Sequence, residues 1–384
     1  MQTRFRASAR RGARLLSIIS AGACVGATLV SCGGGNDDKS PANPAPPTAL
    51  STFSASAVVA DTAAAAAAHV DPNLVNGWGI AFNPTGFVWV ANQGSSTSTL
   101  YDGKGNPQAL VVSVPAGGGG SAGPAGIVYN GTQDFRVNAG TAGGVAAFIF
   151  AGTGGTLSGW SPAVDRTHAI TTVDTAAAGA AAASAYTGLA LASYNGVNYL
   201  YAADFRNGRV DVYDPTWKKV TLPGGGFADS GLPAGYAPYG IQAVGSRIYV
   251  TYAQRATSGP GVNRGAGLGI VDVFEPGGAL VKRLATGGVL NAPWGIAMAP
   301  STFGAAAGKL LVGNFGDGRI HAFDPDSGAV VGVLAKADKT PIAIDGLWGI
   351  AFGNGLNDQP LNTLFYAAGP ANETHGAYGR IDLQ

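Results

Sequence analysis

The tetrapeptide Trp-Gly-Ile-Ala occurs three times in this chain, at residues 78–81, 294–297 and 348–351. The sequence contains 6 Trp among 384 residues, so half of them stand in one repeated context. A motif repeated at long intervals indicates either a site that is used several times or an architecture built from similar units. The segments around each copy decide between these two interpretations.

Six short apolar segments begin with Gly-Ile or Gly-Leu and divide the chain into units. They start at Gly79, Gly126, Gly188, Gly240, Gly295 and Gly349, with spacings of 47, 62, 52, 55 and 54 residues. Further short apolar segments follow in a fixed order, as in YLYAADFRNG and then GRVDVYDP, or KLLVGNFGDG and then GRIHAFDP. Four strands per unit, separated by Gly, Asp and Pro turns, are typical of a propeller blade.

The ends of the repeat indicate how the ring closes. The last unit stops after its third strand, and the β-rich stretch FSASAVVAD precedes the first unit. An N-terminal strand that completes the last blade would remove the exposed edges that a linear array leaves. We therefore expect an all-β fold over residues 53–384, a six-bladed β-propeller with four-stranded blades that is closed by the N-terminal strand.

The first 52 residues have a different composition. Five Arg and no acid precede an apolar run, which is the pattern of a secretory signal. The run ends in Leu29-Val30-Ser31-Cys32, which resembles the lipobox of bacterial lipoproteins. We expect a lipoprotein signal peptide at 1–31, lipidation of Cys32 and a flexible tether at 32–52, rich in Gly, Pro, Asn and Ser. The alternative is an ordinary secretory peptide that is cut elsewhere.

Cysteine and charge restrict the possible partners. Cleavage before Cys32 removes Cys24, so the mature chain could form no internal disulfide. No basic run remains after the signal segment, which argues against nucleic-acid binding. We expect a monomer in the bacterial cell envelope or secreted, attached to the membrane only through its lipid. Its ligand would be a protein, peptide or glycan.

Specific motifs resemble two groups of known propellers. YAADFRNGRVDVYDP and LVGNFGDGRIHAFDPDSG resemble NHL-type repeats, and LNAPWGIAMAP and DGLWGIAFGNG resemble a family of secreted bacterial six-bladed propellers of unknown function. The second resemblance extends from about Val58 to the C-terminus. It implies a fold and an extracytoplasmic location, and it implies no reaction. More distant six-bladed relatives include calcium-dependent lactonases.

Candidate site residues follow from the blade pattern. The residue before each Gly-Ile strand should lie near one mouth of the central channel, on the face where the second strands end. The residues that precede the first strands are Trp78, Ala125, Thr187, Tyr239, Trp294 and Trp348. The residues that end second strands include Asn92, Asp204, Gln254 and Asn314.

Two interpretations of these residues stay open. In the first, the Trp side chains pack between neighbouring blades, and Asn92, Asp204 and Asn314 bind loop backbone. In the second, Trp78, Tyr239, Trp294 and Trp348 form a stacking platform for a sugar or another flat ligand, and the amides orient it. We expect from the second interpretation a ligand site at the channel mouth.

The sequence favours a binding or scaffold protein over an enzyme. The alternative is a metal-dependent propeller hydrolase or lactonase, which would need several oxygen ligands, including carboxylates, in the channel. The positions before the first strands hold no Asp or Glu, so Asp204 and then Asp345 are the best acids. We predict no cofactor and no metal site, with Ca²⁺ possible only under this alternative, and no catalytic residue can be named.

Overall fold

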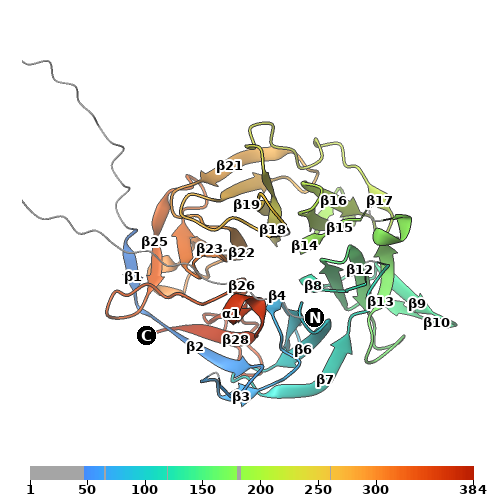
Figure 1. The fold of residues 1–384 in the computed structure, drawn as a ribbon, viewed down its shortest axis with the longest axis horizontal. Coiled ribbons are helices and arrows are strands. Elements are labelled where there is room, and N and C mark those ends of the chain that lie inside the picture. Colours follow the sequence, from blue (N-terminus) through green and yellow to red (C-terminus); the bar gives the residue numbers. More distant parts are fainter. Residues whose placement is uncertain (1–46, 65, 119, 180–182, 260) are drawn as a thin grey trace, which may run out of the picture. The chain divides into compact units, whose positions relative to one another are not determined.

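The computed structural model describes residues 47–64, 66–118, 120–179, 183–259 and 261–384. They belong to one compact unit, Ala45–Gln384. Within it, six small sheets surround a central axis, which confirms the expected six-bladed β-propeller (Figure 1). The predicted signal peptide and Cys32 lie outside the described residues. No helix in the described part of the chain is both long enough and apolar enough to cross a membrane.

Each blade contains four antiparallel strands, and the chain runs outward from the axis. Blade one has β4 (Gly77–Phe82), β5 (Val88–Asn92), β6 (Thr97–Tyr101) and β7 (Pro107–Ser113). Blade two has β8 (Pro124–Tyr129), β11 (Phe148–Gly152), β12 (Thr156–Trp160) and β13 (Ile170–Asp174). Blade three has β14 (Tyr186–Tyr194), β15 (Val197–Asp204), β16 (Arg209–Tyr213) and β17 (Lys219–Val220).

The other three blades repeat this order. Blade four has β18 (Tyr236–Val244), β19 (Arg247–Gln254), β20 (Ile270–Phe274) and β21 (Leu280–Thr286). Blade five has β22 (Pro293–Met298), β23 (Leu310–Asn314), β24 (Ile320–Phe323) and β25 (Val330–Ala335). Blade six has β26 (Leu347–Phe352), β27 (Leu364–Ala368), β28 (Ala377–Leu383) and β2 (Phe53–Ala60).

The N-terminal strand closes the ring as expected. β2 pairs antiparallel with β28, from Phe53 opposite Leu383 to Ala60 opposite Ala377. A short strand before it, β1 (Ala49–Ser51), pairs parallel with β25 and lies within the segment 32–52 that we predicted as a tether. A two-residue strand, β3 (His69–Val70), pairs parallel with β2. These pairings cover the outer edges of blades five and six.

An insertion obscures the repeat in blade two. The hairpin of β9 (Arg136–Ala139) and β10 (Ala142–Val145) lies between its first two strands. Phe135, just before β9, is fully buried and packs edge-on against Trp217 at 5.4 Å. The insertion explains why the sequence shows the second and third strands of this blade poorly. The helical elements are the short η1 (Ala176–Ala178), η2 (Gly304–Ala306) and α1 (Pro370–Glu373).

Close backbone contact explains the repeated Gly of the inner strands. A Cβ added to Gly295 would lie 2.5 Å from the carbonyl oxygen of Trp348, and one added to Gly349 would lie 2.5 Å from that of Trp78. Gly79, Gly126 and Gly240 meet the backbone of the next blade in the same way. The inner strands therefore approach so closely that only about 20 Å³ of space is left among them, roughly the room that one water molecule needs.

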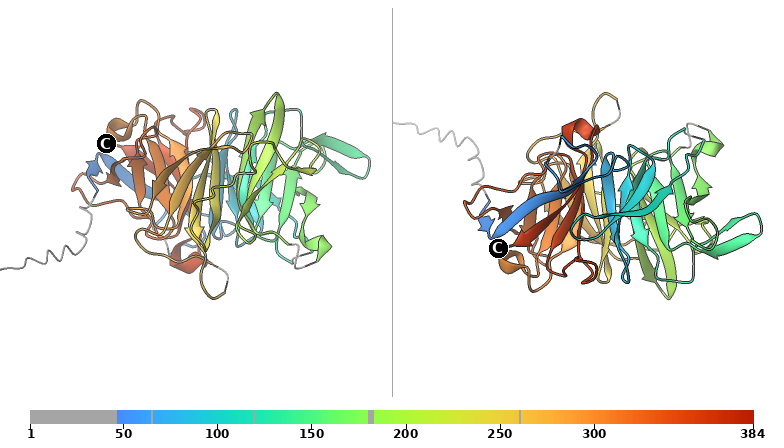
Figure 2. Two further views of the ribbon diagram at one scale, coloured as in Figure 1. Left: turned by 90° about the horizontal axis from the view of Figure 1, so that it is seen from above. Right: turned by 90° about the horizontal axis from the view of Figure 1, so that it is seen from below.

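Apolar side chains fill the space between neighbouring blades. Trp89 of blade one stacks on Phe148 of blade two, with ring centroids 4.1 Å apart. Tyr101 of blade one stacks on Tyr378 of blade six at 5.2 Å. Figure 2 shows the propeller from two sides, with α1 and the loop between β19 and β20 projecting from the same face. The candidate site lies on this face.

Candidate ligand-binding site at the channel mouth

The aromatic residues that precede the first strands meet at the channel mouth. Trp78 stacks on Trp348, with ring centroids 3.5 Å apart and 20° between the planes. Trp294 and Tyr239 meet Trp348 edge-on at 5.8 and 5.7 Å. All four side chains are at most 9% exposed. Trp78 and Trp348 belong to the neighbouring blades one and six, and Trp294 and Trp348 belong to the neighbouring blades five and six, which matches the first interpretation. Together the four rings fill the mouth and do not form an open platform.

Hydrogen bonds fix two of these indoles. Trp294 Nε1 donates to the carbonyl oxygen of Thr187 at 2.9 Å, and Trp348 Nε1 donates to Asn76 Oδ1 at 3.2 Å. The Thr187 hydroxyl donates in turn to the carbonyl oxygen of Tyr239 at 2.7 Å. The indole nitrogen of Trp78 is buried and has no hydrogen-bond partner among the described residues. The aromatic cluster is thus a packed plug that seals the channel.

A cavity of about 630 Å³ lies above this plug. At the position occupied by Trp or Tyr in the other four blades, blades two and three carry the small residues Ala125 and Thr187, and this difference leaves space on their side of the mouth. The floor consists of the aromatic residues Trp78, Tyr239, Phe315 and Trp348. Polar and charged residues of the wall are Gln93, Thr153, Arg206, Arg264 and Glu373. Trp294 lines the narrow space below the plug instead.

The polar residues that end the second strands do not line this cavity. Asn92, Asp204 and Asn314 are all fully buried. Asn92 donates to two threonine hydroxyls at 3.1 and 3.0 Å. Asp204 Oδ1 accepts from the backbone of Ala185 at 3.1 Å, and Asn314 Oδ1 accepts from the backbone of Asn291 at 3.1 Å. The contacts of Asp204 and Asn314 match the first interpretation, in which these side chains bind loop backbone, whereas Asn92 binds threonine side chains instead.

The cavity is instead lined by the residues that directly follow the last residues of the second strands. Gln93, Thr153, Phe205 and Phe315 directly follow β5, β11, β15 and β23. Side chains alternate between the two faces of a strand, so a shift by one residue changes what a side chain meets. The sequence does carry this signal, because the repeated ANQG, DFRNG and NFGDG segments place a variable residue after each Asn or Asp.

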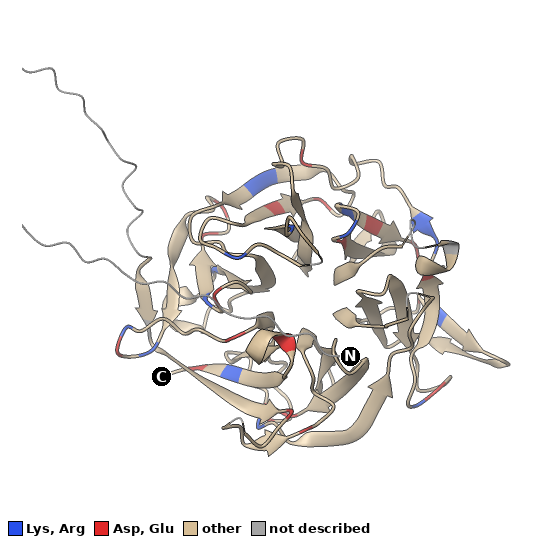
Figure 3. Ribbon diagram, in the orientation of Figure 1, with Lys and Arg blue, Asp and Glu red and all other residues tan. Residues whose placement is uncertain are grey.

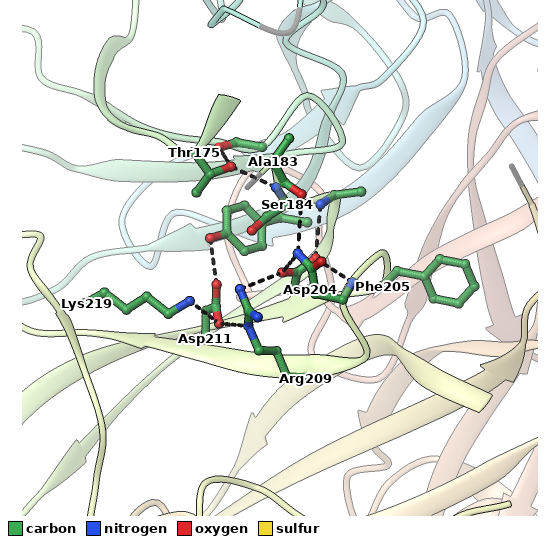
Figure 4. A network of polar contacts seen from close by, with 12 residues as sticks. Thr175, Ala183, Ser184, Asp204, Phe205, Arg209, Asp211 and Lys219 are labelled. Atoms are coloured by element: carbon green, nitrogen blue, oxygen red, sulfur yellow. Dashed lines mark hydrogen bonds and ion pairs between the residues drawn. The ribbon is translucent and has the colours of Figure 1, made fainter. Parts of the chain in front are cut away.

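A polar network holds the turn that carries Phe205 (Figure 4). Asp211 Oδ1 accepts from Arg209 Nε at 2.7 Å and lies 2.6 Å from Lys219 Nζ. Arg209 also lies 3.5 Å from the buried Asp204. The hydrogen bond to Asp211 raises the pKa of Arg209, so this guanidinium stays charged. The cations of this network compensate the negative charges of the buried Asp204 and Asp211 carboxylates. Phe205 points away from these carboxylates, toward the channel mouth.

Arg264 and Glu373 come from two loops over the mouth. The guanidinium carbon of Arg264 lies 4.1 Å from the centroid of Phe315, a cation–π arrangement. Glu373 Oε1 is 3.9 Å from Arg264 Nη2, and Glu373 Oε2 accepts from Asn76 Nδ2 at 3.2 Å. Figure 3 shows the acidic residue of α1 beside the centre of the ring. Charge of both signs therefore borders an otherwise aromatic cavity.

The α1 turn that carries Glu373 has an unusual backbone. Ala371, Asn372 and Glu373 have φ values of 55°, 56° and 68°, in the left-handed region that non-Gly residues rarely adopt. The backbone N–H of Ala371 donates to Asp345 Oδ2 at 2.8 Å, which helps hold the turn. Asp345, an acid that the sequence offered for a metal site, thus supports the turn and does not line the cavity. Strained backbone of this kind is concentrated at functional sites.

The cavity does not match a calcium site. Ca²⁺ takes six to eight oxygen ligands, usually with several carboxylates. Among the described residues, Glu373 is the only carboxylate that lines the cavity. Within the described ranges, no group of three or more His, Cys, Asp or Glu is placed to hold a metal ion. We derive no reaction step through a metal here.

Comparison with known proteins places the chain among uncharacterised relatives. No known family model matches the sequence. Over 320 residues it is 34% identical to an uncharacterised protein of Acanthamoeba polyphaga mimivirus, covering 82% of this chain and 76% of the relative. A second uncharacterised protein of the same virus is 32% identical over 323 residues, with 82% of each chain covered. The chain belongs to the family of these mimivirus proteins.

A solved structure shares the fold of this mimivirus-related chain. A protein of unknown function from Bacteroides thetaiotaomicron aligns with a TM-score of 0.51, over 86% of this chain and 76% of that one. The two sequences are only 14% identical, so the likeness shows the fold alone. The resemblances to NHL repeats and to secreted bacterial propellers stay predictions, because the relatives that show the family are viral and uncharacterised.

Proposed function

We propose that this protein is a non-catalytic ligand-binding propeller that uses the cavity at the channel mouth. The observation that carries the proposal is a cavity of about 630 Å³ whose floor is sealed by packed aromatic rings. Binding sites in proteins are concave and largely apolar, with a few placed polar groups. The mouth has this composition, with Gln93, Arg206, Arg264 and Glu373 above the aromatic floor.

Binding is favoured over hydrolysis by the groups that line the cavity. General acid–base catalysis is carried out by a positioned side chain, most often His and otherwise a carboxylate, Lys, Tyr or Cys, whose pKa lies near the working pH. The described residues give the cavity one carboxylate, that of Glu373, which accepts a hydrogen bond from Asn76 and lies near Arg264. No His in the described ranges lines the cavity. These features support a site that recognises a ligand without transforming it.

The proposed site would act outside the cytoplasm. The Leu29-Val30-Ser31-Cys32 pattern and the Pro-rich segment behind it support a lipid-anchored propeller at a bacterial cell envelope. Cys32→Ala should release the protein from the membrane fraction, whereas Cys24→Ala, inside the predicted signal peptide, should leave it there. Retention of the Cys32→Ala protein on membranes would refute the anchor.

The binding proposal is tested by filling the cavity. Thr153→Trp places a large ring in the wall, and Ala185→Trp does so from blade three. Thr302→Trp is the matched control, because Thr302 is exposed in the loop between β22 and β23, on the opposite face. Thermal unfolding is measured with a panel of oligosaccharides and short peptides. We expect at least one compound to stabilise the wild type and Thr302→Trp but neither cavity variant. Equal stabilisation of all four proteins, or of none, would overturn the proposal.

A further inference from the structure

Positive charge exceeds negative charge around the cavity. Arg206 and Arg264 line it, and Glu373 is the only acid in the described part of the chain that does. A third guanidinium, that of Arg255, lies 5.7 Å from the centroid of Phe205 in the same wall. The nearest buried acid behind this wall, Asp204, is compensated by Arg209 at 3.5 Å. The mouth therefore presents a positive potential to a ligand.

Arg206 is the residue best placed to meet an anion. It is exposed in the turn after β15, and none of its side-chain nitrogens takes part in a hydrogen bond or ion pair with any described residue. The turn itself is anchored, because Arg255 donates two hydrogen bonds to the carbonyl oxygen of Phe205, at 3.0 and 2.7 Å. A guanidinium with free donors on a fixed turn suits bidentate recognition of a planar oxyanion.

Arg264 provides a second cationic group in the lining of the cavity. Its guanidinium stacks on Phe315 and stands 3.9 Å from Glu373, a separation longer than a hydrogen bond. Stacking on an aromatic ring fixes the plane of the group and leaves its N–H donors for other partners. Phe205, which is partly exposed, lies in the same cavity wall. Cationic donors and an aromatic face are thus combined in one cavity.

We infer that the channel mouth binds a small carboxylate-bearing molecule with a flat apolar body. The carboxylate is held by Arg206 and Arg264, and the flat body lies against Phe205 and the edges of the aromatic floor. Glu373 faces the ligand from α1 and disfavours a second negative charge there. This inference rests on the proposed function, since it names the chemistry that the same cavity recognises.

The test compares two probes of the same shape. Naphthoate carries a carboxylate on a flat ring system, and naphthamide is its neutral counterpart. By titration calorimetry, we expect the wild type to bind naphthoate about tenfold more tightly than naphthamide, the range expected for a charge-assisted hydrogen bond. Arg206→Gln should remove this preference. Arg136→Gln should keep it, because Arg136 is an exposed residue of the β9 hairpin and does not line the cavity.

The outcomes separate this inference from the binding proposal. Equal affinity for the two probes, with both blocked by Thr153→Trp, would overturn the carboxylate inference and leave the binding site intact. A preference for naphthoate that persists in Arg206→Gln would also overturn it. If neither probe binds at millimolar concentration, the inference fails, and the oligosaccharide and peptide panel alone decides the proposed function.

Discussion

Trp294 of blade five donates a hydrogen bond of 2.9 Å to the carbonyl oxygen of Thr187 in blade three. The bond reaches past blade four and joins two blades that are not neighbours in the ring. It helps to hold the aromatic cluster whose rings form the floor of the cavity. The first role of the repeated Trp residues is therefore structural, because they form the plug below the binding surface.

The first prediction concerns this bond. Trp294→Phe removes the donor and leaves the Thr187 carbonyl unpaired in a buried setting, which costs about 1–3 kcal/mol. Trp78→Phe is the matched control, because Trp78 is equally buried and its indole nitrogen has no partner in the described structure. Urea unfolding should show the larger loss for Trp294→Phe. Equal losses of stability in the two variants would mean that the hydrogen bond between Trp294 and Thr187 contributes nothing to stability.

A second prediction concerns the glycine of the repeated motif. Gly295→Ala should destabilise the protein by about 1–3 kcal/mol, as overpacking does, because its Cβ would lie 2.5 Å from the Trp348 carbonyl oxygen. Gly131→Ala serves as the control, since its nearest neighbour would be 3.4 Å away, an ordinary contact. Both are compared by urea unfolding. A Gly295→Ala protein as stable as the control would contradict the tight contact between inner strands.

The third prediction concerns Asp272, a fully buried acid in β20. Its carboxylate oxygens have no hydrogen-bond partner among the described residues, and Arg283 Nε is 3.7 Å away. Burial, assisted by nearby Asp229, raises the pKa of Asp272 to about 7. The folded state thus binds this proton more tightly than the unfolded state. The stabilising contribution is complete below pH 3.8, the ordinary pKa, and is lost as the pH rises through about 7.

Asp272→Asn should remove this pH dependence. The free energy of unfolding is measured in urea between about pH 5 and about pH 8. The wild type should lose more stability than Asp272→Asn over this interval. Parallel curves for the two proteins would show that Asp272 is ionised in the fold throughout.

The fourth prediction concerns His321 in β24, whose effect on stability has the opposite pH dependence to that of Asp272. It is 2% exposed, its ring nitrogens have no partners in the described structure, and burial lowers its pKa to about 4. The neutral ring is favoured in the fold, so its contribution is complete above the ordinary pKa of 6.5 and is lost as the pH falls through about 4. His321→Leu should flatten the acid limb of the stability curve. Acid limbs that stay parallel in the wild type and His321→Leu would argue against a buried neutral His321.

Much of the fold could be predicted from repetition in the sequence. The Gly-Ile strands and the DFRNG and NFGDG turns mark blades, and β2 completes blade six as expected. Blade two was poorly visible because the β9–β10 hairpin interrupts it. Repetition reveals a blade because each copy has the same order of strands and turns.

The site was predicted less completely. The structure places Trp78, Tyr239 and Trp348 at the mouth, but a sequence does not state which way an aromatic side chain points or which hydrogen bonds it makes. The choice of Asn92, Asp204 and Asn314 missed the lining residues by one position. Arg264 lies in the loop between β19 and β20, and Glu373 lies in α1, and the described residues of the other blades form no counterpart of either segment. The repeat therefore could not align these two residues. Closure of the ring brings them together.

The central claim is that the cavity above the aromatic plug is the binding site of this propeller. A crystal structure of the protein with the tightest ligand from the panel tests it most directly. The account predicts ligand density between Phe205, Arg206 and Arg264, resting on Trp78 and Tyr239, with the Trp294–Thr187 bond unchanged. Density at another surface, with the channel mouth empty of ligand, would contradict it.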